Sequence, residues 1–275
     1  MGTSLMGRLF KWVQRPLADA AVAIADIGVE TPAGPKVNDE QRLAVSDVLW
    51  GEGFLWPGGE AEIMRLVAPL GLSAAHSLLF VGCGAGGPAR VISGSLGVWV
   101  SGFEADGKLA AIATRRLQRC GIPLAKRATI GTWRPEAAAF PARGFHHGVL
   151  LDVLDSGDPV TILAAAIQAV KPGGQVIVVQ TLAGTRGDAL GRTIPQILEA
   201  HGCDVRIVED ESARHARLVL QGWRAMLRQI RGERPGAAEA ASLVEEAARW
   251  LYRLRDIREG RLRVVRWVAI APRVN

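Results

Sequence analysis

One stretch of the sequence, residues 78–88 (LLFVGCGAGGP), restricts the fold more than any other. Four apolar residues run directly into a turn that has glycine at four of its six positions, 82 to 87. Glycine lets the backbone turn sharply and brings amide N–H groups close to a ligand at the start of the next helix. The stretch therefore predicts a strand, a ligand-binding turn and a helix, the arrangement with which an α/β domain binds a nucleotide.

The spacing of the glycines and of a later carboxylate supports this interpretation. The glycines match both a GxGxG pattern and the GxGxxG pattern of dinucleotide sites, and either match alone is a weak signal. Eighteen residues after Gly86, a second apolar segment (GVWVSGFEAD) ends at Glu104. A carboxylate at the end of a second strand can accept hydrogen bonds from both hydroxyls of an adenosine ribose. Loop, helix, strand and acid in this order indicate a cofactor site rather than a tight turn followed by a surface glutamate.

From residue 77 onward, apolar segments of strand length alternate with segments of helical periodicity. We expect strands at 77–82, 97–103, 126–131, 147–151, 175–181 and 203–209, with helices from about 87, at 107–119, 158–170 and 190–201. This alternation predicts an α/β fold with a doubly wound, mostly parallel sheet. After residue 210 two long helices are expected, followed by a last strand at 263–271.

These elements suggest a division of the chain into two parts. Residues 1–59 are expected to form an N-terminal helical cap with a lid loop. Residues 60–275 are expected to form the sheet domain, with a helical insertion at about 211–258. An amphipathic helix expected at 5–27 carries Phe10 and Trp12; we favour a lid, a core contact or a contact to a second subunit over a membrane surface for it. A homodimer or another protein partner is left open.

Composition excludes several classes of protein. The cysteines, Cys83, Cys120 and Cys203, are widely spaced without a CxxC pair, which argues against a disulfide scaffold or a metal site and favours a cytoplasmic location. No apolar run reaches the roughly 18 residues of a membrane span. The net charge is +6, but acidic residues are interspersed and no nucleic-acid-binding motif is present, so no nucleic-acid partner is expected.

Three later segments carry a resemblance to a known family. VKPGGQVIVVQ (170–180), LLDVLDSGDP (150–159) and the closing RWVAIAP resemble motifs of class I S-adenosylmethionine-dependent methyltransferases. GEGFLWPGG (51–59) is similar to a loop that folds over the cofactor in the phosphoethanolamine and sarcosine N-methyltransferase group. The resemblance implies a Rossmann-like seven-stranded sheet with an antiparallel last strand, S-adenosylmethionine as cofactor and methyl transfer to a small-molecule acceptor.

The resemblance also implies which residues bind the cofactor. The glycine loop would cradle its amino-acid part, Glu104 would hold the ribose, and Thr132 and Trp133 would border the adenine. The implied cofactor-binding residues are Phe54, Leu55, Trp56, Val81, Gly82, Cys83, Gly84, Gly86, Glu104, Ala105, Thr132, Trp133 and Leu151. Cys83 is interpreted as a small loop residue and not as a nucleophile.

Candidate catalytic residues follow from polar side chains around the fourth strand. Asp152 and Asp155 come just after it, at the carboxyl edge where open α/β sheets bind ligands; the alternative is that they cap the next helix. His146 precedes it and could act as a base near neutral pH, the alternative being a surface or capping residue.

The chain also departs from the family pattern in the predicted pocket. Phe80 stands where the family usually has Asp, no carboxylate follows the third strand, and Asp155 stands where the phosphoethanolamine group has a catalytic His. Three hypotheses follow: a methyltransferase that binds its cofactor through backbone N–H groups and Glu104, a catalytically inactive scaffold that binds a protein partner, and a nicotinamide dinucleotide site.

Overall fold

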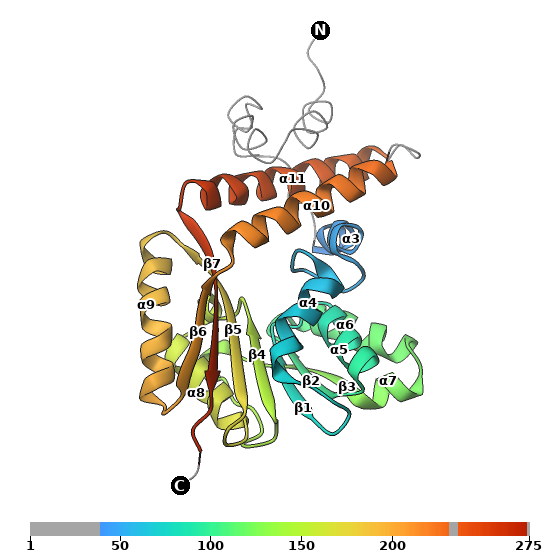
Figure 1. The fold of residues 1–275 in the computed structure, drawn as a ribbon. Helices are drawn as coiled ribbons and strands as arrows, with labels where there is room; N and C mark the ends of the chain where they lie inside the picture. The colour runs from blue at the N-terminus through green and yellow to red at the C-terminus, as the bar shows by residue number, and fades with distance from the viewer. Residues whose placement is uncertain (1–38, 231–235, 274–275) are drawn as a thin grey trace. The chain divides into compact units, whose positions relative to one another are not determined.

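The predicted alternation of strands and helices builds one seven-stranded sheet in the computed structural model, which describes residues 39–230 and 236–273 (Figure 1). The strand order is β3-β2-β1-β4-β5-β7-β6. β1 to β5 pair in parallel, whereas β7 runs antiparallel to β6. The strands are β1 Ser77–Val81, β2 Trp99–Glu104, β3 Ala128–Thr132, β4 His147–Leu151, β5 Gln175–Ala183, β6 Asp204–Asp210 and β7 Leu262–Ile270. The fold class predicted from the sequence is confirmed.

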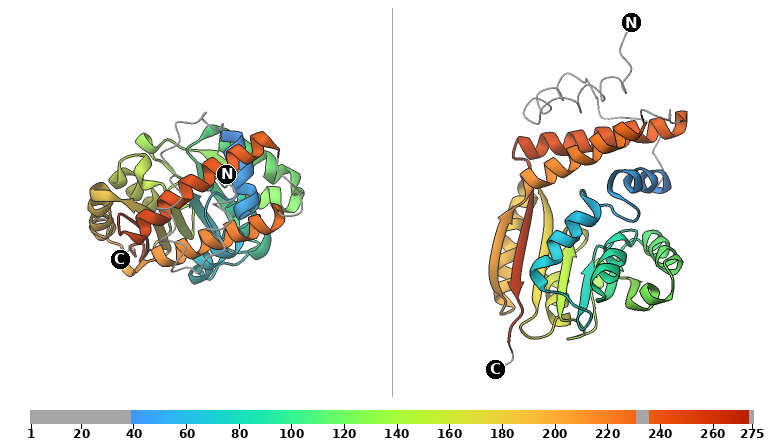
Figure 2. Two further views of the ribbon diagram at one scale, coloured as in Figure 1. Left: turned by 90° about the horizontal axis from the view of Figure 1, so that it is seen from above. Right: turned by 45° about the vertical axis from the view of Figure 1, so that its right-hand side comes forward.

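Helices cover both faces of this sheet, as Figures 1 and 2 show: α8 and α9 lie on one face, and α4 and α5 on the other. The helices of this part are α4 Gly59–Val67, α5 Gly87–Leu96, α6 Gly107–Arg119, α7 Ile122–Arg127, α8 Pro159–Ala169 and α9 Gly184–Ala200, with short 3₁₀ turns at Ala68–Leu70, Pro135–Ala137 and Leu154–Ser156. β4 and β5 are buried over almost their whole length, as expected of central strands covered on both faces.

Two of these helices differ from the sequence prediction. α9 begins at Gly184 rather than near residue 190, and two of the glycines in its first turns allow it to pack closely against Leu182. A Cβ atom at Gly187 would lie 2.8 Å from the Cα of Leu182, and one at Gly191 would lie 2.7 Å from its Cδ1. α7 was not expected at all; it starts with proline in its first turn, where the missing N–H costs nothing, and it delays β3 to residue 128.

The chain divides into two compact units. The sheet unit comprises Gly59–Glu211 and Arg263–Asn275, and the helical unit comprises Met1–Gly58 and Ser212–Leu262. The helix expected at 5–27 lies outside the described residues. No helix in the described ranges is long and apolar enough to cross a lipid bilayer.

Three helices make up the described part of the helical unit: α3 Asp39–Trp50, α10 Ser212–Ile230 and α11 Ala237–Arg258. The ring of Trp50 meets that of Trp250 edge-on, with centroids 5.4 Å apart. Trp223 and Leu251 are also buried, so the apolar stripes expected on the two long helices form core. α10 approaches α3 so closely at Gly222 that any side chain there would overlap the Trp50 ring.

We expect Gly222→Ala to destabilise the protein by about 1–2 kcal/mol, because the cost of overpacking against Trp50 exceeds the helix-propensity gain of about 1 kcal/mol. The free energy of unfolding in denaturant is the measurement. Gly236→Ala is the control, because a Cβ there meets nothing within 4 Å. Equal stability of the two variants would contradict the packing argument.

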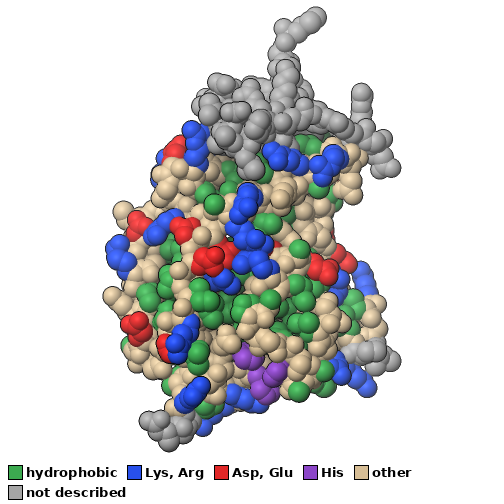
Figure 3. All heavy atoms as spheres, in the orientation of Figure 1, with side chains coloured by type: hydrophobic (Ala, Val, Ile, Leu, Met, Phe, Trp, Pro, Cys, Tyr) green, Lys and Arg blue, Asp and Glu red, His purple; other side chains and the backbone are tan. Residues whose placement is uncertain are grey.

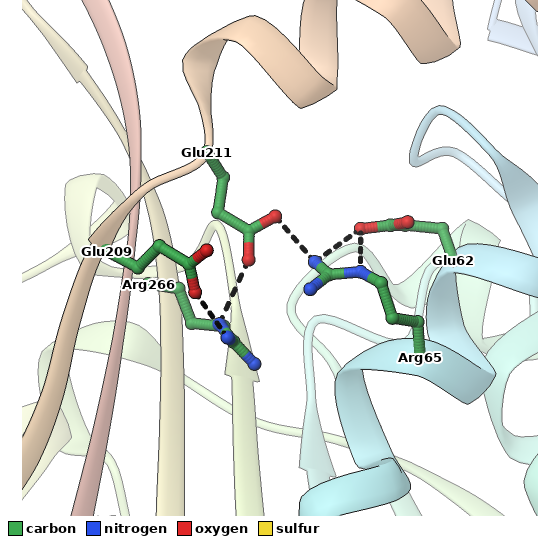
Figure 4. Close-up of polar contacts among 5 residues, drawn as sticks. All are labelled: Glu62, Arg65, Glu209, Glu211 and Arg266. Carbon is green, nitrogen blue, oxygen red and sulfur yellow. Dashed lines mark hydrogen bonds and ion pairs between the residues drawn. The ribbon is translucent and has the colours of Figure 1, made fainter.

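A buried ion-pair network joins α4 to the β6–β7 pair within the sheet unit (Figure 4). Arg65 lies 2.7 Å from Glu62 and 2.5 Å from Glu211, the residue that follows β6. Arg266 on β7 continues the network to Glu211 at 3.0 Å and to Glu209 at 2.5 Å. Glu62 and Glu211 are buried, and removing charged groups from water is costly unless opposite charges compensate.

The network changes the proton affinity of its central cation. Burial lowers the pKa of Arg65, but hydrogen bonds and charge from Glu62 and Glu211 outweigh burial and raise the pKa above its ordinary value. Arg65 therefore stays charged and neutralises two buried carboxylates at once.

Arg65→Met is expected to lower the free energy of unfolding by about 3 kcal/mol, since it takes this guanidinium away from Glu62 and Glu211. Arg263→Met is the matched control in the same unit, because the Arg263–Asp188 ion pair is exposed and contributes about 0.5 kcal/mol at most. Denaturant titrations of both variants test the difference; similar losses would show that burial does not matter here.

Candidate functional site

The carboxyl ends of four strands bring the predicted site residues to one edge of the sheet. The glycine loop follows β1, Glu104 ends β2, Thr132 ends β3 and Asp152 follows β4. The parallel register aligns these ends, since Val81 pairs with Phe103 and Leu150, and Glu104 pairs with Thr132. This is the edge at which open α/β sheets bind ligands.

The glycine loop has a backbone that only glycine adopts readily. Gly82, Gly84 and Gly86 have φ angles of 83°, 56° and 94°. A Cβ at Gly82 would also overlap the carbonyl oxygen of Leu151 and lie 2.7 Å from Val153 Cγ1. Gly86 then precedes α5 as an N-cap without a side-chain cap bond, so no side chain covers the first amide groups of the helix, of which Pro88 contributes none.

Glu104 holds this loop from the neighbouring strand. Its Oε2 accepts a hydrogen bond from the N–H of Gly84 at 2.8 Å, and its Oε1 accepts one from Asp106 N–H at 3.2 Å. Burial raises the pKa of Glu104 above its usual range, although the backbone N–H groups act in the opposite direction. The carboxylate is therefore partly desolvated, and backbone donors fix its orientation.

Phe80 and Cys83 contribute packing to the loop rather than chemistry. Phe80 is fully buried in β1, between Gly102 of β2 and Val149 of β4, so the acid that the family has at this position has no polar replacement there. Cys83 is also buried, and burial together with the charge of Glu104 raises the pKa of its thiol. A neutral thiol agrees with its interpretation as a small loop residue.

Trp133 and Thr132 lie beside Glu104, as the sequence suggested. The N–H of Trp133 donates to the backbone oxygen of Glu104 at 3.3 Å, and its indole packs near Phe140 with centroids 5.9 Å apart. The indole Nε1 is buried and has no hydrogen-bond partner among the described residues. Trp133 is thus a buried residue whose backbone is hydrogen-bonded to the strand end that carries Glu104.

Asp152 and Asp155 stand together after β4. Asp152 has a left-handed backbone (φ 55°), and its Oδ1 accepts a hydrogen bond from Thr181 N–H at 2.8 Å. Burial, followed by the charge of Asp152, raises the pKa of Asp155. The cap of α8 is Asp158, whose side chain accepts from the backbone of Val160 and Thr161. Neither Asp152 nor Asp155 is therefore the cap of that helix.

Gln180 was missed in the sequence, although its side-chain amide donates hydrogen bonds to both aspartates. Its Nε2 lies 3.2 Å from Asp152 Oδ1 and 3.2 Å from Asp155 Oδ2, and its Oε1 accepts from Leu154 N–H at 2.9 Å. An amide directly after four apolar residues of the strand (VIVV, 176–179) was the available signal, because a buried polar side chain needs partners.

His146 is a correction to the sequence interpretation. It precedes β4 and therefore lies at the amino edge of the sheet, at the opposite end of the strand from Asp152. Its Nδ1 accepts from Ser77 N–H at 3.0 Å, and its Nε2 is 3.0 Å from Lys171 Nζ. His146 is no candidate for catalysis at the carboxyl edge, because β4 separates it from that edge.

Histidine side chains gather at the lower end of the face drawn in Figure 3. In this cluster the ring of His76 meets the rings of His146 and His147 at centroid distances of 5.1 and 5.7 Å. His147 Nδ1 accepts from Gln175 N–H at 3.1 Å. Burial, with smaller effects of His76 and His146, lowers the pKa of His147 to about 4.

The remaining predicted cofactor residues lie on several elements. Val81 and Leu151 are buried ends of β1 and β4, and Ala105 is exposed after Glu104. Phe54, Leu55 and Trp56 belong to the helical unit, where the Trp56 ring lies 4.8 Å from that of His215. Their contact with the cofactor stays a prediction.

Solved structures share this arrangement. Phosphoethanolamine N-methyltransferase 2 of Haemonchus contortus, in complex with phosphomonomethylethanolamine and S-adenosylhomocysteine, superposes with a TM-score of 0.71 at 18% identity, over 84% of this chain and 57% of that one. The fold is that of class I S-adenosylmethionine-dependent methyltransferases. A geranyl diphosphate methyltransferase in complex with S-adenosylmethionine has a TM-score of 0.57 at 15% identity, covering 77% of this chain and 85% of that one. The methyltransferase fold predicted from the sequence is confirmed.

The same fold also occurs in a protein with another reaction in its name. The [4+2]-cyclase SpnF has a TM-score of 0.65 at 17% identity, over 90% of this chain and all of that one (100%). The methyltransferase fold by itself therefore does not decide the activity, which depends on the residues at the carboxyl edge.

Sequence comparison points to the same group. No protein-family model matches the chain. Phosphoethanolamine N-methyltransferase 2 of Caenorhabditis elegans is 26% identical over 170 residues, which are 61% of this chain and 37% of that protein. The chain thus spans well under half the length of this relative. The resemblance to the phosphoethanolamine N-methyltransferase group is confirmed, because members of that group are among the similar sequences and structures.

The amino-edge histidines of this methyltransferase fold predict a pH-dependent stability. His147 takes up a proton in the unfolded chain near its ordinary pKa of about 6.5 but in the folded protein only near 4. Stability that is complete above about pH 6.5 is therefore lost as the pH falls toward 4. The charges of His76 and His146 act on His147 in the same direction as burial. Burial and the charges of Lys171 and His76 likewise lower the pKa of His146.

We expect His147→Gln to lose less stability than the wild type between pH 7 and pH 5, because glutamine can accept from Gln175 N–H but does not titrate. Thermal unfolding at the two pH values is the measurement, with His201→Gln at the end of α9 as the control. If the stability of His147→Gln depended on pH as that of the wild type does, His147 would not be the group that causes the loss of stability at low pH.

Proposed function

We propose that this chain binds S-adenosylmethionine at the carboxyl edge of the sheet and transfers its methyl group to a small molecule. The observation that carries the proposal is the hydrogen bond from Gly84 N–H to Glu104, which joins the glycine loop to the acid at the end of β2. When bound, the cofactor supplies an electrophilic methyl group on a sulfonium.

The residues at this edge fit such a cofactor. The uncapped start of α5 suits a carboxylate, and the glycine loop allows close approach of a ligand to backbone N–H groups. The Glu104 carboxylate is oriented by Gly84 and Asp106 and can accept from ribose hydroxyls. Thr132, which pairs with Glu104, and Trp133, which follows it, are proposed to border the adenine. Phe54, Leu55 and Trp56 are proposed to contact the cofactor on the strength of the loop resemblance.

Asp152 and Asp155 are proposed to face the acceptor. Methyl transfer needs a lone pair placed in line with the methyl group, so an acceptor that arrives protonated must lose a proton first. Burial and the charge of Asp152 raise the pKa of Asp155, so Asp155 is proposed as the group that accepts this proton. The names of the relatives make phosphoethanolamine and its methylated forms the first acceptors to assay.

Glu104→Ala is expected to weaken binding of S-adenosylhomocysteine by roughly 10- to 100-fold, because it removes charged hydrogen-bond acceptors from the ribose and from the loop. Isothermal titration calorimetry is the measurement. Glu199→Ala, an exposed position at the end of α9, is the control and should bind like the wild type.

A wild-type protein that shows no binding up to millimolar S-adenosylhomocysteine would contradict the proposal. In that case the inactive-scaffold hypothesis would account for the fold, since the same sheet would then serve only to bind a partner.

A further inference from the structure

The most constrained polar side chain at the carboxyl edge is Gln180 near the end of β5. It is a polar residue within β5, yet its exposed fraction is only 1%. A buried amide costs free energy unless its oxygen and both its hydrogens find partners. The hydrogen-bond partners of the Gln180 amide therefore indicate its role.

The amide group of Gln180 faces two different kinds of partner. On one side, its Oε1 accepts from Leu154 N–H at 2.9 Å, which fixes the short turn Leu154–Ser156 that carries Asp155. On the other side, its Nε2 lies 3.2 Å from Asp152 Oδ1, 3.2 Å from Asp155 Oδ2 and 3.1 Å from the Thr181 backbone oxygen. One NH₂ group with two hydrogens is thus shared among three oxygen acceptors.

This sharing opposes the repulsion between two carboxylates. Burial and the negative charge of Asp152 both raise the pKa of Asp155. The charge of Arg186 and the hydrogen bond from the Gln180 amide act in the opposite direction and favour the ionised form. Two hydrogen bonds to β5 support the left-handed backbone of Asp152. Its N–H donates to Val179 O at 2.7 Å, and its side-chain Oδ1 accepts from Thr181 N–H. A backbone in this region is rarely adopted without such support.

We propose that Gln180 is a positioning residue that holds Asp152 and Asp155 together as one oriented pair facing the methyl acceptor. The role toward the acceptor rests on the function proposed above. The role toward the two carboxylates rests only on the contacts of the Gln180 amide and can be tested without substrate.

Two variants distinguish the role of the Gln180 side-chain oxygen from that of its NH₂ group. Gln180→Glu keeps an oxygen that can accept from Leu154 N–H but replaces the NH₂ donor by a second acceptor. Gln180→Met has similar length and no polar group. Gln175→Met is the control, because Gln175 begins the same strand at the amino edge, and its side-chain amide lies 3.5 Å from Pro69 O.

The measurement is the pH titration of the Asp155 side-chain carboxyl carbon by NMR in the wild type and the three variants. We expect the midpoint to rise by at least about 0.5 pH unit in Gln180→Met, since the donor that stabilises the ionised form is lost. The rise should be larger in Gln180→Glu, which adds a third negative charge. Gln175→Met should titrate like the wild type.

Calorimetry with S-adenosylhomocysteine accompanies the titration. Binding within about twofold of the wild type shows that the variants are folded and that Gln180 acts on the aspartates and not on the cofactor. An Asp155 midpoint unchanged in both Gln180 variants, or raised equally in Gln175→Met, would overturn the inference. Absence of binding by the wild type would contradict the proposed function, while the Asp155 midpoint would still decide whether Gln180 holds the pair.

Discussion

The site depends on the parallel register of β1 with β2 and β4. Backbone hydrogen bonding along these strands puts Val81 beside Phe103 and Leu150, so three chain segments far apart in sequence end at the same edge. The glycine loop, Glu104 and Asp152 come together for this reason alone. A slip of one residue would turn every side chain to the opposite face. It would also move Gly82 away from the Leu151 carbonyl oxygen, against which only a residue without a Cβ fits.

The carboxylates at the site have different partners from the buried carboxylates elsewhere in the sheet unit. At the carboxyl edge, Glu104, Asp152 and Asp155 are oriented by backbone N–H groups and one side-chain amide. Such donors fix a carboxylate without neutralising it, which leaves its charge available to a ligand. Between α4 and the β6–β7 pair, by contrast, arginine guanidinium groups face buried glutamates directly (Figure 4). That network stabilises the packing of the sheet unit and leaves little net charge behind.

Several elements could be predicted because local physics decided them. The glycine loop, the strand that precedes it and Glu104 follow from backbone freedom and apolar patterning, and the structure has them at the expected positions. The start of α9 could not be predicted, because Gly187 looks like a loop residue until Leu182 is found against it. His146 looked like a candidate base until the register placed it at the amino edge.

The amino-acid sequence by itself determined the order of the strands, the glycine turn and the acid at the end of β2, because each depends on neighbouring residues. Only the tertiary structure decided that Glu104 anchors Gly84 across two strands and that Gln180 lies between Asp152 and Asp155. The physical reason is that hydrogen bonds between distant segments form only where the sheet register and the burial of polar groups bring donor and acceptor together.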